Sequence, residues 1–203
     1  GEELAELGRM AASGARVRVF SDDGKCVADS LLMRRALSYV TAFDGVIAQH
    51  SQDLRLAGAG ACCHESEYSG RLGLPGWPSQ AESSIVARDV QLAELTGSRI
   101  HVCHVSTAES VDVIRWAKRR GIQVTAEVTP QHWLRGTPEV WGYDTTFKVN
   151  PPVRTSEHVE AGREALADGT IDTVGTDHAP HARQDKDDPF DVALPGMIGL
   201  EQA

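Results

Sequence analysis

The chain has 203 residues, of which 41% are hydrophobic and 24% are charged, which is typical of a globular protein with one large or two small domains. The net charge of −9 argues against a general nucleic-acid-binding protein, which needs a basic surface to contact phosphates. No apolar run reaches the ~20 residues of a membrane-spanning helix, and no segment resembles a secretory signal peptide, so we expect no membrane partner and a cytoplasmic location.

The four cysteines do not form a regularly spaced disulfide framework. Cys62 and Cys63 are adjacent, so they can bond to each other only with strain, and no Cys-x-x-Cys motif occurs. We therefore expect reduced thiols that mostly pack in the interior.

Strand-like and helix-like segments alternate along the first half of the chain. We predict a helix at residues 2–13, a strand at 16–20, a helix at 30–42 and a strand at 45–49. Residues 51–77 are rich in glycine and irregular, so we predict a long loop there, which in a compact domain is usually functional or disordered.

The second half continues the alternation, with helices predicted at 78–95, 107–120 and 156–167, and strands at 99–103, 122–128 and 171–176. Pro78 suits the first position of its helix. Ser106 and Glu109 have the spacing of a capping box before the helix at 107–120. The β-branched strand at 171–176 is expected to be buried.

This alternation predicts right-handed βαβ units and a parallel sheet. The sheet could be open and doubly wound, or it could be part of a (β/α)₈ barrel. The glycine pattern of a dinucleotide-binding fold is missing after every predicted strand, which disfavours that class.

Polar side chains follow every predicted strand. In a parallel barrel these carboxyl ends converge on one face, where the active site is built. Histidines and carboxylates gathered in this way favour zinc or a similar divalent metal. In chain order the candidates are Asp22 and Asp23; His50; Cys103 and His104; Glu127, Thr129 and His132; and Asp177, His178 and His181.

Each candidate also has a structural interpretation. A single histidine near a strand end is more often a hydrogen-bonded structural residue than a ligand, and Asp22 and Asp23 before Gly24 could form a turn. Asp177 could cap the segment after its strand. His101, inside a strand, and His158, in a helix expected to be exposed, are not predicted to be ligands. A Ser-His-Asp hydrolase is weakly supported because no Gly-x-Ser-x-Gly elbow occurs.

Several motifs together resemble the class I dihydroorotases of the amidohydrolase superfamily. They are "VRVFSDDG", "RLGLPGWPSQAES", "HVCHVSTAES", "FKVNPPVR", "GTIDTVGTDHAPH" and "LPGMIGLE". The resemblance implies a (β/α)₈ barrel with two zinc ions that catalyses the reversible cyclisation of N-carbamoyl-L-aspartate to (S)-dihydroorotate in pyrimidine biosynthesis. The predicted strands then correspond to about the fourth to eighth of the barrel. Residues 1–203 would form one partial catalytic domain without the N-terminal barrel strands and the C-terminal part.

The resemblance also implies roles for metal ligands. Asp23 would be the carboxylate that bridges the two metals, and His50 and His104 would bind one of them. Asp177 would bind the other metal and act as the catalytic general base. His178 is expected to lie behind the ligands rather than among them.

Four further residues are implied to bind the substrate. Asn150 and His181 would contact it directly. Pro195 and Gly196 would belong to a loop whose backbone contacts the pyrimidine ring.

The chain departs from this family in one important respect, because it has no His-x-His motif to complete the second metal site. We therefore expect it to bind at most one zinc ion well and to be poorly active by itself. Gln131 stands where the family often has histidine. The natural protein is expected to begin upstream of Gly1.

Two alternative functions stay open from sequence. One is another cyclic amidohydrolase, such as a hydantoinase or an allantoinase. The other is a non-catalytic dihydroorotase-like subunit that assembles with aspartate transcarbamoylase. The resemblance also leaves open a homodimer, while the expected ligand of the site itself is a small molecule.

Overall fold

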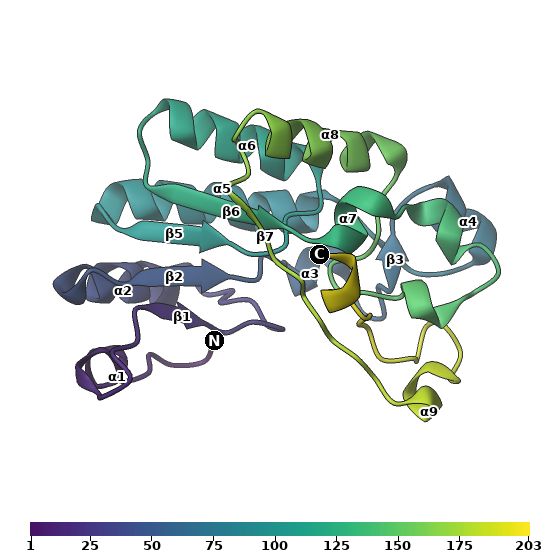
Figure 1. Cartoon of the computed structure of the whole chain (residues 1–203), viewed down its shortest axis with the longest axis horizontal. Coiled ribbons are helices and arrows are strands. Elements are labelled where there is room, and N and C mark those ends of the chain that lie inside the picture. The colour runs from purple at the N-terminus through teal and green to yellow at the C-terminus, as the bar shows by residue number, and fades with distance from the viewer.

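Five parallel strands form the centre of the computed structural model, which describes residues 1–203. Their order across the sheet is β1-β2-β5-β6-β7. Four long helices lie against one face of the sheet, as Figure 1 shows: α2 (Ser30–Val40), α5 (Gln80–Thr96), α6 (Ala108–Arg119) and α8 (Ser156–Ala167). The strands are β1 (Val19–Ser21), β2 (Val46–Gln49), β5 (Arg99–Val102), β6 (Val124–Val128) and β7 (Thr173–Val174). The predicted parallel α/β sheet is confirmed.

The two faces of the sheet have different chemistry. In β6, Val124, Ala126 and Val128 are buried against the helices, whereas Thr125 and Glu127 point to the opposite, open face. The helix-covered side forms a continuous apolar core. The open face is the one that would line the interior of a closed barrel.

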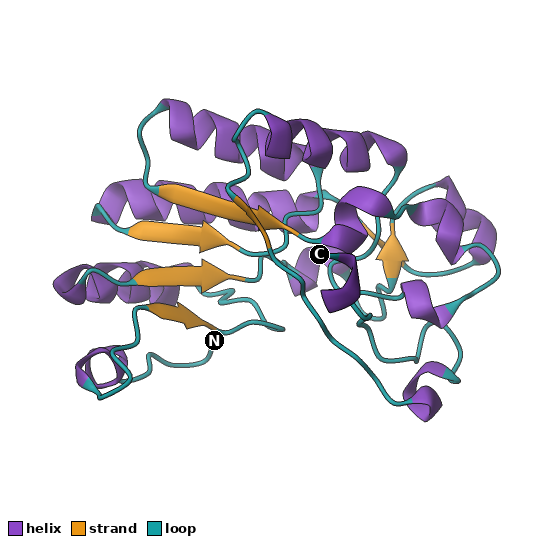
Figure 2. Cartoon of the chain, in the orientation of Figure 1, coloured by secondary structure: helices purple, strands orange, loops and turns teal.

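Shorter elements gather beyond the carboxyl ends of the strands (Figure 2). Residues 51–77, predicted as loop, contain a small two-stranded parallel sheet of β3 (Cys63–His64) and β4 (Gly76–Trp77). The other helices of this region are α3 (Leu54–Ala57), α4 (Glu67–Leu72), α7 (Pro130–Leu134) and α9 (Arg183–Lys186), with 3₁₀ turns at Thr137–Val140, Thr145–Phe147 and Leu200–Gln202. A further 3₁₀ turn, Thr41–Phe43, extends α2, and α1 (Leu7–Ala12) lies beside the β1 edge.

Several local predictions were wrong. The first helix begins at Leu7 rather than at residue 2, and β1 begins at Val19 rather than at residue 16. The capping box at Ser106 does not form, because the Ser106 hydroxyl donates to the carboxylate of Glu82. Thr107 is the N-cap of α6 instead, and its hydroxyl oxygen accepts from the backbone N–H of Ser110.

The last strand also differs from its prediction. Only Thr173 and Val174 pair with β6, and both are exposed because β7 lies at the edge of the sheet with no strand on its other side. His158, expected on an exposed helix, is buried, and its Nδ1 accepts from the backbone N–H of Ala108.

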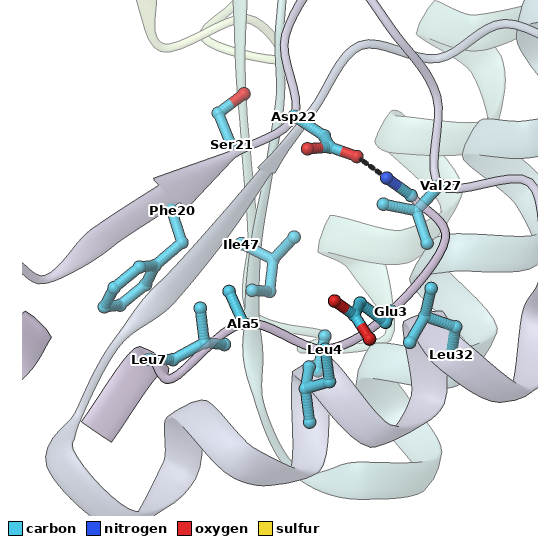
Figure 3. Close-up of a pocket in the computed structure, with 12 residues that line it drawn as sticks. Glu3, Leu4, Ala5, Leu7, Phe20, Ser21, Asp22, Val27, Leu32 and Ile47 are labelled. Carbon is cyan, nitrogen blue, oxygen red and sulfur yellow. Dashed lines mark hydrogen bonds and ion pairs between the residues drawn. The ribbon is translucent and has the colours of Figure 1, made fainter. Parts of the chain in front are cut away.

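An apolar cavity of about 110 Å³ lies between the N-terminal segment, β1 and α2 (Figure 3). Leu7, Phe20, Leu32 and Ile47 line it, and Asp22 at its rim pairs with the N-terminal ammonium group. Of the candidate site residues, Asp22 alone lines this mostly apolar cavity. None of the helices combines the length and the apolar character that crossing a membrane requires.

Candidate metal centre

Three of the predicted metal ligands lie together at the carboxyl ends of neighbouring strands. Asp23 Oδ1 lies 3.1 Å from His104 Nε2 and 3.3 Å from His50 Nδ1, and the two ring nitrogens are 3.0 Å apart. The imidazoles are almost completely buried, whereas the Asp23 side chain is 50% exposed. The three donor atoms therefore form a nearly equilateral triangle that is open on the carboxylate side.

The size of this triangle suits one zinc ion. In tetrahedral coordination with bonds of about 2.0 Å, ligand atoms lie about 3.3 Å apart, which is close to the separations found here. Two imidazoles and one carboxylate are also a zinc-type donor set. The residues present thus fit one metal ion with three protein ligands and an open coordination position.

Local backbone structure places each of the three predicted ligands. Asp23 lies in the turn after β1, where its backbone N–H donates to Ser21 Oγ and its own Oδ1 accepts from the N–H of Gly24. His50 follows β2 directly. His104 follows β5 with a left-handed φ of 35°, which turns its ring toward the end of the sheet.

The triangle keeps the Asp23 carboxyl in its charged form. The hydrogen bond from His104, with the imidazole of His50 close by, holds the pKa of the Asp23 carboxyl well below its usual range. Burial opposes a charge on His104, yet the hydrogen bond with Asp23 and the charge of Asp177 outweigh burial and raise the pKa of that imidazole. The site therefore holds a firmly ionised carboxylate.

Asp177 lies within electrostatic reach of this triangle. It is half-buried, with a left-handed φ of 42°. Burial raises the pKa of the Asp177 carboxyl, the charge of His104 lowers it, and the Asp23 carboxylate raises it further. A carboxyl with a raised pKa can exchange a proton near neutral pH more readily than an ordinary aspartate.

A hydrogen-bonded chain through Gln52 connects Asn150 to His50. Asn150 Nδ2 donates to Gln52 Oε1 over 3.3 Å, and the same oxygen accepts from His50 Nε2 over 2.6 Å. The Asn150 Oδ1 atom is buried without a hydrogen-bond partner. An unpaired buried acceptor beside the ligands is suited to receive an N–H of a bound molecule.

The other predicted substrate residues form a second group. His181 and Gly196 line a cleft of about 260 Å³, together with Thr146, Lys186 and Met197. The His181 Nε2–H donates to the carbonyl oxygen of Pro195, and the Gly196 N–H donates to the carbonyl oxygen of Lys148. Gly196 thus adjoins the segment that carries Asn150, while His181 follows Asp177 along the chain.

A second cluster of metal-type donors lies on the open face of the sheet. His101, Cys103 and Glu127 place one donor atom each within 4.8 Å of one another. His101 Nε2 and a carboxylate oxygen of Glu127 already lie 3.4 Å apart. Burial and the nearby carboxylates raise the pKa of the Cys103 thiol to about 12, so this thiol stays protonated. His132, another candidate, donates from Nε2 to the Pro151 carbonyl oxygen and is not in either cluster.

Sequence reasoning missed three residues that support the site. Gln52 contacts His50, as described above. Glu82 accepts hydrogen bonds from the backbone N–H groups and hydroxyls of Ser106 and Thr107, just after His104. Arg154, also buried, donates from Nε to Ser106 Oγ. Glu82 and Arg154 lie within the recognised motifs "QAES" and "NPPVR", but their partners are distant in sequence.

The family model described as dihydro-orotase-like matches residues 1–110, which is more than half of the chain. The chain belongs to this family. The match covers Asp23, His50 and His104, although it says nothing of the roles of these residues.

Curated relatives of this dihydro-orotase-like chain support the same family assignment. It is 68% identical over its whole length to a dihydroorotase of Leifsonia xyli subsp. xyli and 60% identical to one of Streptomyces coelicolor. The chain spans about half the length of these relatives, 46% and 47% respectively. The recognised resemblance to dihydroorotases is confirmed.

A solved structure supports the fold. A D-hydantoinase from Bacillus sp. AR9 superposes with a TM-score of 0.83 at 20% identity, over 98% of this chain and 48% of the other. At that identity the likeness shows the fold alone. The dihydro-orotase-like chain is a partial (β/α)₈ barrel of the amidohydrolase type, as predicted.

Proposed function

We propose that this chain is part of a zinc-dependent dihydroorotase, which interconverts N-carbamoyl-L-aspartate and (S)-dihydroorotate in pyrimidine biosynthesis in the cytoplasm. One observation carries the proposal: Asp23, His50 and His104 form a triangle of zinc-type donors at the sheet's carboxyl end. The named dihydroorotases at 60–68% identity support the choice of substrate.

The donor set indicates which chemistry a metal would add. Asp23, His50 and His104 would hold one zinc ion and leave a position free for the reaction. When bound, zinc acts as a Lewis acid that polarises the carbonyl group of the scissile amide.

Asp177 is the proposed general base and acid. In the hydrolytic direction its carboxylate takes a proton from the attacking water and then gives that proton to the departing amide nitrogen. Ring closure reverses these transfers. The raised pKa of Asp177 supports this role because the group must hold the proton between the two steps.

Asn150 and His181 are the proposed substrate-binding residues. The buried, unpaired Oδ1 of Asn150 suits an N–H of the substrate's carbamoyl group. His181 and Gly196 line a cleft where the rest of the ring would lie, and the Pro195 carbonyl oxygen accepts a hydrogen bond from His181. Holding the ring against the reacting water supplies the orientation part of catalysis.

The first test assays the chain after loading with Zn²⁺. We expect slow hydrolysis of dihydroorotate that disappears in Asp177→Asn, and no hydrolysis of hydantoin or allantoin. Preferential hydrolysis of hydantoin would instead support a hydantoinase. That outcome is worth measuring because the D-hydantoinase of Bacillus sp. AR9 has a similar fold.

A second test replaces the matching half of the Leifsonia xyli dihydroorotase by residues 1–203. The chimera should retain activity toward dihydroorotate, and Asp177→Asn should lower its kcat by about 10²-fold or more, the lower range for a general acid–base group. A folded chimera with no activity would contradict the proposal and favour a non-catalytic subunit, for which binding to aspartate transcarbamoylase would then be measured.

A further inference from the structure

We propose that Gln52 is a positioning residue that fixes the tautomer of His50 and so prepares this histidine to bind the metal. Its side chain is buried, and Oε1 lies 2.6 Å from His50 Nε2. The inference rests on the proposed function, because it assumes that the triangle of Asp23, His50 and His104 holds a metal ion.

The chemistry of an amide oxygen determines the tautomer. Gln52 Oε1 can only accept hydrogen bonds, so the proton on the neutral His50 ring must be on Nε2. The lone pair is then on Nδ1, the atom that faces Asp23 and His104 in the triangle. Metal-binding histidines commonly donate their other N–H to such an outer acceptor, which orients the ring.

Asn150 supports this orientation of the amide. Its Nδ2 donates to the same Gln52 oxygen over 3.3 Å. If the Gln52 amide were turned around, two NH₂ groups would face each other across this contact. One oxygen atom therefore links a proposed metal ligand to a proposed substrate-binding residue.

The backbone around Gln52 is held firmly. The N–H of the next residue, Asp53, donates to the carbonyl oxygen of Ala81 over 2.7 Å. The Asp53 side chain also accepts from the N–H groups of Arg55 and Leu56 at the start of α3. Gln52 thus has a fixed position from which to orient His50.

His104 provides an internal contrast. Its Nδ1, the ring nitrogen outside the triangle, is buried and has no hydrogen-bond partner, so no outer acceptor determines the tautomer of His104. Gln52 is therefore the only side chain that holds the outer nitrogen of a proposed histidine ligand. Removing it should affect metal binding more than removing an ordinary buried glutamine.

The test compares Gln52→Leu, Gln52→Glu and a control, Gln131→Leu. Leucine removes the acceptor, while glutamate retains it. Gln131 is a buried glutamine whose side-chain atoms make no hydrogen bonds. Two properties are measured: the tautomer of His50 by long-range ¹H–¹⁵N spectra of the metal-free chain, and the Zn²⁺ affinity by competition with a chromophoric chelator.

We expect the wild-type chain and Gln52→Glu to show a proton on His50 Nε2. In Gln52→Leu this preference should be lost, and the Zn²⁺ affinity should fall 10–100-fold, the range for loss of an outer hydrogen-bond partner. Gln52→Glu should stay close to the wild-type affinity, and so should Gln131→Leu.

Wild-type Zn²⁺ affinity in a folded Gln52→Leu variant would overturn the role of Gln52 while leaving the metal centre intact. An unchanged His50 tautomer in that variant would also overturn it. If the wild-type chain bound no Zn²⁺ at all, the proposed metal-dependent function would fail instead, so the two failures are distinguishable.

Discussion

The Nη2 atom of Arg154 lies 3.6 Å from a carboxylate oxygen of Glu82, and both side chains are almost completely buried. Glu82 holds the backbone just after His104, while Arg154 follows the segment that contains Asn150. The pair therefore links the backbone beside His104, a proposed metal ligand, to the segment of Asn150, a proposed substrate-binding residue. Removing one member would leave a buried charge without its partner.

We expect Arg154→Met to lower the free energy of unfolding by about 3–5 kcal/mol, the usual cost of breaking a buried ion pair by removing one partner. Arg115→Met is the matched control, because Arg115 pairs with Asp168 where both side chains are partly exposed. The control should cost less than about 1 kcal/mol. Urea denaturation followed by tryptophan fluorescence measures the free energy of unfolding of both variants. Equal decreases in the two variants would show that burial does not make the Arg154–Glu82 pair more important than the exposed pair.

Stability should decrease on mild acidification. Burial lowers the pKa of His64 and of His132 to about 4, whereas an unfolded histidine has a pKa of about 6.5. Between these values the unfolded chain binds protons that the folded chain does not, so stability is full above about pH 6.5 and falls as the pH approaches 4. The expected loss at pH 5 is about 1–2 kcal/mol for each histidine.

Urea denaturation at pH 7.5 and pH 5 tests this pH dependence. His132→Asn should reduce the difference between the two values, since one of the two responsible groups is then absent. The same stability at both pH values in the wild-type chain would show that these imidazoles do not stay neutral when folded.

Metal titration should give one tightly bound Zn²⁺ per chain. His104→Ala should abolish tight binding because it removes one of the three ligands, whereas His101→Ala should bind zinc as well as the wild type does. Isothermal titration calorimetry measures both the stoichiometry and the affinity. Two tight zinc ions per chain, or loss of binding only in His101→Ala, would point to the cluster on the open face of the sheet instead.

Gly196 should not tolerate a side chain. Its φ is 146°, and an added Cβ would lie 2.6 Å from the Ala179 carbonyl oxygen and 2.7 Å from His181 Nε2. Gly196→Ala should therefore displace His181 and weaken binding of dihydroorotate about 10-fold or more, equivalent to about 1.4 kcal/mol. Gly142→Ala, where φ is also positive but the space is open, controls for backbone strain. Equal binding of dihydroorotate by the two variants would contradict the proposal that His181 binds the substrate.

The positions of the two histidines of the candidate site are predictable from the sequence, because they depend on local strand patterns. His50 and His104 come just after predicted strands, and a parallel sheet brings such ends together. The motif "SDDG" suits a turn as well as a ligand, so the prediction of Asp23 depends on the family resemblance. The structure brings these three residues together, while the roles of Asp177, Asn150, His181, Pro195 and Gly196 stay predictions.

The parts that could not be predicted depend on contacts between distant residues. Ser106 has the right spacing for a capping box, yet Glu82, on another helix, binds its hydroxyl. Gln52 contacts Asn150, which is 98 residues away in the sequence, so no local pattern predicts this contact. β3 and β4 are two residues each, too short for an alternating pattern to be visible in a glycine-rich segment.

The left-handed backbone of His104 and Asp177 limits which amino acids can replace them. At φ values of 35° and 42°, β-branched residues are strongly disfavoured, whereas glycine, asparagine and aspartate are tolerated. In a saturation library selected only for folding, asparagine and glycine should therefore be enriched at both positions. If His104 and Asp177 have the proposed roles, both their chemistry and their backbone conformation restrict substitution, so few single changes at these positions would preserve both.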